Sequence, residues 1–301
     1  MYLLQYGRIF FEGFEPLSYS EEKNMAYKII GDSCCDFTKL QMKKGNIVRV
    51  PMSIIIGGVE YRDDGLRNQE EWIRLIKEDP GYPKSACPSP DAFYSAFDEN
   101  CDNYVITLSA KLSGVYNSAM VAKEMFGEEH EGVRIHVFDS KSAAAGESLL
   151  TEKIIKFADE GLSFDEVVEK GEKFRDEMFT VFVLDDLETF KKNGRLKGIK
   201  ALVATTMNVK PVLVGDDGEI KQIDQAIGMT RAINRMLYHI EKKDIDKSAS
   251  IRITQCDSKE LCTKIARILT ERFGFSDVKI INAGGLSTTY ENPGGVVMAI
   301  G

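Results

Sequence analysis

The feature that most constrains the fold is the alternation of β-rich runs with amphipathic helical patterns along the chain. Apolar, β-branched runs predict strands at residues 27–31, 47–56, 104–108, 134–138, 180–184, 210–214, 251–255 and 278–282. Helical spacing of apolar residues predicts helices near residues 68–78, 90–99, 113–126, 142–160, 164–176, 186–192, 228–240 and 258–273. Strands that alternate with helices in this way are typical of an α/β fold.

Two tight turns interrupt this alternation and predict antiparallel strand pairs. Gly57 and Gly58 stand together between two β-rich runs, which is a hairpin signal. A turn rich in Gly and Asp at residues 215–218 indicates a second hairpin. We therefore expect a mixed sheet in the later part of the chain.

Several helix ends are marked by residues that favour capping. Ser163 with Glu166, and Asp185 with Glu188, have the spacing of a capping box. Gly194 follows a lysine-rich helix and suits the left-handed position beyond a helix end.

A chain of 301 residues is accommodated more easily by two domains than by one. A polar helix ends near residue 176 and an apolar strand follows, which predicts α/β domains at residues 25–176 and 177–301. Residues 1–24 precede the first clear strand and are expected to be an extension outside the fold. They contain early glutamates and no small-residue cleavage site, so they do not resemble a signal peptide.

Charge and composition exclude several classes of function. A net charge of −8 argues against a general surface for nucleic acid or anionic membranes. No apolar run approaches the ~20 residues that a membrane span requires. The six cysteines and three histidines show no metal-ligand spacing, so we expect no metal, no cofactor and free thiols in the cytoplasm.

The stretch "TLSAKLSGVYNSA" at residues 107–119 is a candidate anion site. It ends a buried strand and then places Ser109, Ser113 and Gly114 at the start of a helix. The free N–H groups and the dipole of a helix N-terminus favour an anion there. The stretch lacks the glycine pattern of a phosphate loop and has one lysine, which leaves open which anion it would hold.

Other loops combine hydroxyl side chains with strand or helix ends. They lie at Asp32-Ser33, Ser85, residues 139–148 and residues 288–295. Ligands of open α/β sheets bind where such loops converge. Arg195 either belongs to a solvated basic cluster or holds its guanidinium near an anion or a partner.

The order of eight motifs resembles the DegV family. They are "DSCCDF", "VPMSIIIGGVEYRDDG", "KSACPSPDAF", "LSAKLSGVYNSA", "VFDSKSAAAGESLL", "LETFKKNGRLKG", "NVKPVLVGDDGEI" and "TTYENPGG". The resemblance covers about residues 26–301. It implies two α/β domains that bind one long-chain fatty acid, and a role as the lipid-carrying subunit of bacterial fatty acid kinase. Catalysis would then belong to the partner kinase, which transfers phosphate from ATP.

The resemblance also implies which residues hold the fatty acid carboxylate. The family's Thr-Ser-x-Pro-Ser motif falls on residues 85–89, so its carboxylate-binding Thr corresponds to Ser85. The family's Ser-x-Leu-Ser-Gly-x-Tyr motif points to Ser113 with the Gly114 amide, and to Ser109 as the alternative. Its Gly-Arg pair makes Arg195 a candidate for contact with the head group or the kinase.

The last motif departs from the family pattern Thr-His-Thr-Gly-Pro-Gly. Tyr290 replaces the His and can still donate a hydrogen bond. Glu291 adds an acidic group that would oppose a carboxylate if it pointed inward.

Two alternatives to the kinase subunit stay open. The protein could carry or sense another lipid or small carboxylate without a kinase partner, which the two substitutions favour. It could also be an enzyme that uses Cys87 or a serine as nucleophile, although no GxSxG motif is present.

Overall fold

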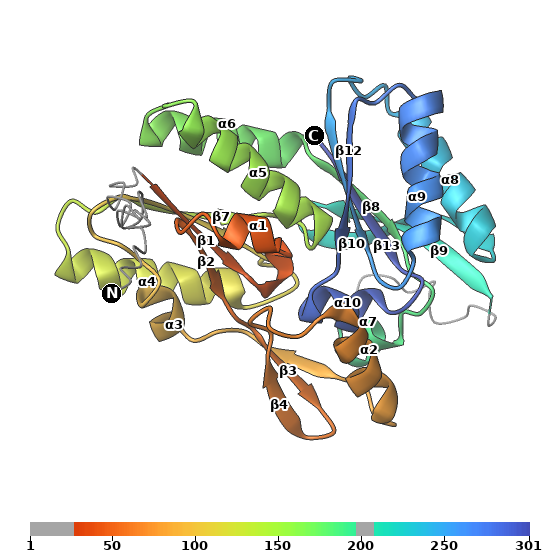
Figure 1. Ribbon diagram of the computed structural model, residues 1–301, viewed down its shortest axis with the longest axis horizontal. Coiled ribbons are helices and arrows are strands. Elements are labelled where there is room, and N and C mark those ends of the chain that lie inside the picture. Colours follow the sequence, from red (N-terminus) through yellow and green to blue (C-terminus); the bar gives the residue numbers. More distant parts are fainter. Residues whose placement is uncertain (1–26, 197–207) are drawn as a thin grey trace, which may run out of the picture.

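The computed structural model describes residues 27–196 and 208–301, so the expected extension at residues 1–24 lies outside the described residues. Strands and helices alternate along the chain and form three sheets. The expected α/β fold is confirmed (Figure 1). No described helix is both long enough and apolar enough to cross a bilayer.

The first sheet is parallel and has the strand order β2-β1-β6-β7. Its strands are β1 (Tyr27–Asp32), β2 (Ile47–Val50), β6 (Asp102–Thr107) and β7 (Ile135–Asp139). Helices cover both faces, α3 (Pro90–Tyr94) and α4 (Val115–Glu129) on one side, and α5 (Ala145–Asp159) and α6 (Phe164–Glu177) on the other (Figure 1). Consecutive side chains therefore face different layers: Ile29 packs in a cluster with Val167, whereas Ile30 packs in a cluster with Phe93.

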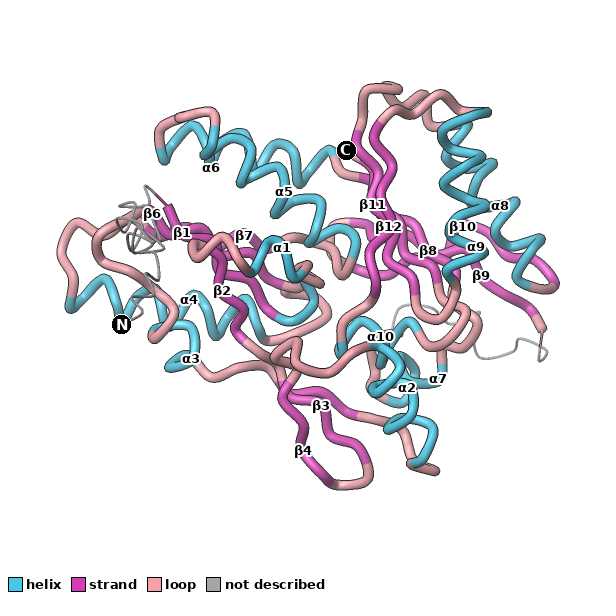
Figure 2. Tube along the Cα trace, in the orientation of Figure 1, coloured by secondary structure: helices cyan, strands magenta, loops and turns pink. Residues whose placement is uncertain are grey.

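The second sheet is small, antiparallel and ordered β4-β3-β5. It consists of β3 (Ser53–Ile56), β4 (Val59–Arg62) and β5 (Lys84–Ala86), with α2 (Gln69–Glu78) packed nearby. The expected hairpin is confirmed, because Gly57 and Gly58 join β3 to β4 with φ values of +58° and +82°. Figure 2 shows this hairpin projecting away from the other two sheets.

The expectation of one strand over residues 47–56 is wrong. The run divides at Pro51 and Met52 into β2 and β3, which belong to different sheets. Pro51 has no N–H to continue a ladder. The N–H of Met52 instead donates to Ser33 Oγ at 2.8 Å, so the chain turns from one sheet to the next.

The third sheet is mixed, as expected, and has the order β10-β9-β8-β13-β11-β12. Its strands are β8 (Phe179–Val183), β9 (Val209–Asp216), β10 (Glu219–Ile227), β11 (Ser250–Gln255), β12 (Asp277–Asn282) and β13 (Val296–Ile300). The pair β9–β10 forms the expected second hairpin, and β11–β12 is parallel. Strand β13 was not expected from the sequence, although it lies at the centre of this sheet.

The two faces of the third sheet have different neighbours. One face packs against α8 (Met229–Lys242) and against α9 (Lys259–Arg267), which continues into η3 (Ile268–Arg272). Val181 and Val183 point to that side, whereas Phe182 and Val297 join the core shared with the first sheet. Buried Arg252 on β11 also connects the third sheet to α5, a helix that covers the first sheet. Its Nη2 lies 2.5 Å from Glu152 Oε2 on α5.

The remaining short elements are η1 (Ser33–Cys35), α1 (Lys39–Met42), α7 (Glu188–Lys192) and α10 (Gly285–Glu291). The first two sheets take their strands from residues 27–139 and the third from residues 179–300. We propose on this basis that the domains divide near residue 176, into residues 25–176 and 177–301.

Two of the three expected helix caps are present. Ser163 and Glu166 form a capping box at α6, and Gly194 has φ +72° beyond the end of α7. The box expected from Asp185 and Glu188 is wrong, because α7 begins after Leu187. Asp185 instead pairs with Lys210 Nζ at 2.8 Å.

Candidate functional site

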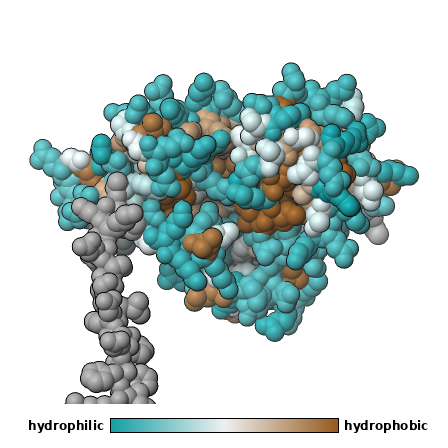
Figure 3. All heavy atoms as spheres, turned by 45° about the horizontal axis from the view of Figure 1, so that its top comes forward, coloured by the Kyte–Doolittle hydropathy of each residue, from teal (hydrophilic) through white to brown (hydrophobic). Residues whose placement is uncertain are grey.

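A cavity lies between the carboxyl ends of the first sheet and the inner face of the third. It holds about 820 Å³ of empty space, part of it open to solvent. Apolar side chains dominate its wall, among them Leu108, Leu112, Phe182, Leu184, Leu286 and Val297. These residues come from the loop after β6, from β8, from α10 and from β13, so the cavity depends on both larger sheets. On the face of the molecule in Figure 3, hydrophilic residues predominate and the broadest apolar area lies near the middle.

Hydroxyl groups meet at one part of this wall. Ser85 Oγ lies 2.9 Å from Tyr290 OH, in a hydrogen bond that joins β5 to α10. The Tyr290 ring packs on Phe190 of α7, with ring centroids 4.9 Å apart. Ser113, at the start of α4, lines the same cavity. The structure therefore brings Ser85, Ser113 and Tyr290 together from segments that are far apart in the sequence.

Arg195 adds a cationic group to the same wall. Its Nε donates to Leu112 O at 3.4 Å, and its Nη1 donates to Asn193 O. The left-handed Gly194 turns the chain after α7, and this turn brings Arg195 to the cavity. The guanidinium is thus held against the loop that leads into α4, beside Ser113.

Ser109 and Gly114 take other positions. The Ser109 side chain is fully buried, donates to Gly218 O at 2.8 Å and accepts from the Lys111 N–H. It ties the loop after β6 to the β9–β10 turn and does not line the cavity. Gly114 is the N-cap of α4, is exposed, and is likewise not part of the wall.

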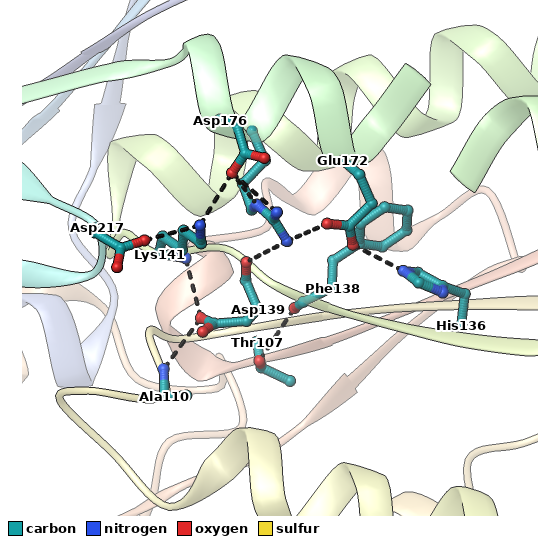
Figure 4. A network of polar contacts seen from close by, with 10 residues as sticks. Thr107, Ala110, His136, Phe138, Asp139, Lys141, Glu172, Asp176 and Asp217 are labelled. Carbon is teal, nitrogen blue, oxygen red and sulfur yellow. Dashed lines mark hydrogen bonds and ion pairs between the residues drawn. The ribbon is translucent and has the colours of Figure 1, made fainter. Parts of the chain in front are cut away.

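A polar network lies around Lys141 (Figure 4). Lys141, which lines the cavity, extends its Nζ to Asp217 Oδ1 at 2.8 Å and to Asp176 Oδ1 at 3.1 Å. Asp217 belongs to the β9–β10 turn and Asp176 to α6. The ammonium group is therefore neutralised by two carboxylates, and both raise the pKa of Lys141 through hydrogen bonds.

The start of α10 is held by two buried carboxylates from distant segments. Asp63 accepts hydrogen bonds from Gly285 N at 3.1 Å and Leu286 N at 2.7 Å. Asp36 accepts from Gly284 N at 2.7 Å and from Ser287 Oγ at 2.8 Å. Burial raises the pKa of Asp36 to about 7, although these donors oppose the shift. The contacts fix α10, and with it Tyr290, against the first part of the chain.

Helix α10 is the element of the site that sequence reasoning missed. The sequence predicts a loop at residues 288–295, whereas residues 288–291 belong to this helix. The helix starts at Gly285 without a side-chain cap of its own, since its capping carboxylates come from more than 200 residues away. Glu291, which the sequence marked as a group that could point inward, lines the cavity.

The structure gives no support to a nucleophile activated by histidine. All three histidines pair with carboxylates: His130 with Glu99, His136 with Glu172 and His239 with Asp224. None of them lines the cavity in the described part of the chain. Cys87 is exposed and lies outside the cavity wall. Among residues 27–196 and 208–301, no group of three metal-ligating side chains comes together.

Comparison with known proteins decides the family. A family model described as "Uncharacterised protein, DegV family" matches residues 26–300. The chain belongs to the DegV family. A DegV domain-containing protein of Streptococcus pneumoniae is 31% identical over 277 residues, which cover 91% of this chain and 98% of that relative.

Solved DegV structures have the same fold. A DegV family protein from Ruminococcus gnavus, refined with vaccenic acid, is 37% identical with a TM-score of 0.87. The fatty acid kinase (Fak) B3 protein of Streptococcus pneumoniae, loaded with linoleic acid, is 30% identical with a TM-score of 0.84. Each comparison covers 91% of this chain and 99% of the other.

Proposed function

We propose that this DegV protein binds one long-chain fatty acid in the cavity and presents its carboxylate at the group formed by Ser85, Ser113, Arg195 and Tyr290. The observation that carries the proposal is a largely apolar cavity whose wall includes hydroxyl and guanidinium donors. The fatty acids in the related structures support the same ligand class.

The chemistry of the cavity fits an amphiphile with a single anionic group. Each buried methylene contributes ~0.8 kcal/mol, so an acyl tail supplies most of the affinity. A carboxylate requires only a few hydroxyl, amide or guanidinium donors. A dinucleotide would require more positive charge, and Lys141, the other cation of the wall among the described residues, is already paired with two aspartates.

The direct test is native mass spectrometry of the purified protein, followed by solvent extraction and lipid analysis. We expect a bound mass that matches one fatty acid per chain. Ligand-free protein that also fails to bind added oleate and palmitate would contradict the proposal.

We propose further that the bound fatty acid serves a partner fatty acid kinase, as the name of the Streptococcus pneumoniae relative suggests. The phosphoryl transfer then takes place on the kinase, and Arg195 faces the reacting head group. Arg195→Ala should lower acyl-phosphate formation with kinase and ATP by much more than it lowers fatty acid affinity.

Lys191→Ala is the matched control for Arg195. Lys191 is an exposed cation of α7 that pairs with Glu188 at 3.3 Å and does not line the cavity. We expect this variant to behave like the wild type in both assays. A loss in Arg195→Ala that is confined to lipid affinity would remove the kinase role from Arg195.

A second candidate function is a lipid or carboxylate carrier without a kinase partner. The placement of Tyr290 and Glu291 in the cavity favours it, because these residues depart from the family motif. The same kinase assay separates the two functions: a protein that retains fatty acid but yields no acyl-phosphate would favour the carrier.

A further inference from the structure

Glu291 is a buried carboxyl group without a hydrogen-bond partner in the described part of the chain. It is the last residue of α10, directly follows Tyr290, and lines the cavity. The residue is 3% exposed, and neither Oε1 nor Oε2 has a partner among residues 27–196 and 208–301. A buried polar group in a native protein is nearly always paired, so this carboxyl lacks the partner that a ligand could provide.

The buried aspartates near the cavity, in contrast to Glu291, have hydrogen-bond partners. Asp32 accepts from the N–H groups of Cys34 and Leu108, and Asp36 and Asp63 each accept two hydrogen bonds at α10. Their carboxylates are used by the fold. The Glu291 carboxyl makes no such contact, although its own helix is held in place from several sides.

The surroundings of Glu291 favour its neutral form. The titratable groups that influence it, or are influenced by it, are Asp36, Cys256 and Cys262. None of them is a cation, and among residues 27–196 and 208–301 the cations that line the cavity are Lys141 and Arg195. Burial, with a smaller contribution from Asp36, raises the pKa of Glu291 well above its usual range.

We propose that Glu291 is a neutral carboxylic acid that donates a hydrogen bond to the ligand's carboxylate, so that the two carboxyl groups share one proton. The inference rests on the proposed fatty acid site and adds a specificity-determining residue to it. The shared pair carries one negative charge, and Tyr290, one residue earlier, presents its hydroxyl to the same cavity. A neutral acid can donate one hydrogen bond, whereas an ionised carboxylate can only accept.

The arrangement makes retention of the ligand dependent on pH. Two carboxyl groups that share a site cannot both ionise without strong repulsion. When the pH rises through the raised pKa of Glu291, the shared proton is lost and the ligand's carboxylate meets a second negative charge. Fatty acid affinity should therefore fall at high pH, while a ligand with an uncharged head group should be unaffected.

The experiment compares palmitate binding by the wild-type protein and Glu291→Gln from about pH 6 to about pH 9. The amide of the variant stays neutral and keeps an N–H donor. The ratio of the wild-type to the variant Kd should rise once the pH exceeds the raised pKa of Glu291, by about 10-fold for each further pH unit. The titration of free palmitate affects both proteins and therefore cancels in the ratio.

Two controls separate electrostatics from damage to the fold. Glu147→Gln removes another fully buried carboxyl, whose Oε1 also lacks a partner among the described residues but which does not line the cavity. Its Kd ratio to the wild type should stay constant with pH. Binding of 1-hexadecanol, which has the same tail and no charge, should give a constant ratio for Glu291→Gln as well.

A second measurement covers the case in which Glu291→Gln does not fold. Infrared difference spectra of wild-type protein with ¹³C-labelled glutamate should contain a protonated carboxyl band that shifts when palmitate binds. A Kd ratio that does not change with pH, or a labelled carboxyl band that does not shift when palmitate binds, would contradict the role of Glu291 but not the proposed function. Failure of the wild type to bind palmitate at any pH would overturn the proposed function with it.

Discussion

Helices α4 and α10 begin beside the same cavity, but their N-termini are used in opposite ways. The first N–H groups of α10 are bound by Asp63, and the N–H of its N-cap Gly284 is bound by Asp36. Helix α4 starts at the N-cap Gly114, and no side chain in the described parts of the chain caps it. One helix start is thus neutralised by protein carboxylates, whereas the other is left without an acidic partner.

The difference indicates where a ligand carboxylate can be accommodated. The positive end of a helix dipole favours one nearby anion, and at α10 two buried aspartates already occupy that role. An additional carboxylate there would meet like charge. At α4, Ser113 lines the cavity and Arg195 is anchored on the carbonyl of Leu112. The start of α10 therefore serves assembly of the fold, and the start of α4 is the better place for a ligand's anion.

The largest expected effect concerns the neutralised helix start. Asp63→Ala removes both acceptors at α10 and leaves the Gly285 and Leu286 N–H groups buried without partners. We expect the free energy of unfolding to fall by about 3 kcal/mol, measured by urea denaturation. Asp64→Ala is the matched control, because Asp64 is exposed and accepts only from Leu66 N. Equal losses in the two variants would contradict the anchoring role of Asp63.

The sequence predicted the elements whose signals are local. Paired glycines specified the β3–β4 hairpin, and the spacing of Ser163 and Glu166 specified a capping box, because each depends on residues a few positions apart. Helix α10 has no such signal, since the carboxylates that hold it come from Asp36 and Asp63. Strand β13 was missed for a similar reason: its apolar run near the chain end forms a strand through pairing with β8 and β11.

The sequence predicted which residues belong to the site, but not how they are arranged in space. The family motifs singled out Ser85, Ser113 and Tyr290, and the structure places all three in one cavity wall. Ser109 stands on the same motif, yet its hydroxyl bonds to the carbonyl of Gly218. The motif contains two serines four residues apart. The sequence alone does not show which of them faces the cavity, because residues of the third sheet form part of the cavity wall.

A smaller effect is expected at the uncapped helix start. Ser113→Ala removes a hydroxyl from the cavity wall, and we expect fatty acid affinity to fall by ~1–3 kcal/mol, or about 5- to 150-fold. Titration calorimetry or displacement of a fluorescent fatty acid would measure this change. Ser118→Ala, on the same helix and outside the wall, should leave the Kd unchanged. Unchanged affinity in Ser113→Ala would move the ligand's carboxylate away from α4.

The smallest effect should distinguish the two serines that precede α4. Ser109→Ala loses the hydrogen bond to Gly218 O and the acceptor for Lys111 N, which connect this loop to the β9–β10 turn. We expect a loss of about 1 kcal/mol in the free energy of unfolding and little change in fatty acid affinity, because the hydroxyl does not reach the cavity. Thermal unfolding and ligand titration of the same sample test both parts. A variant with normal stability and weakened binding would exchange the roles of Ser109 and Ser113, and with them the position of the ligand's carboxylate.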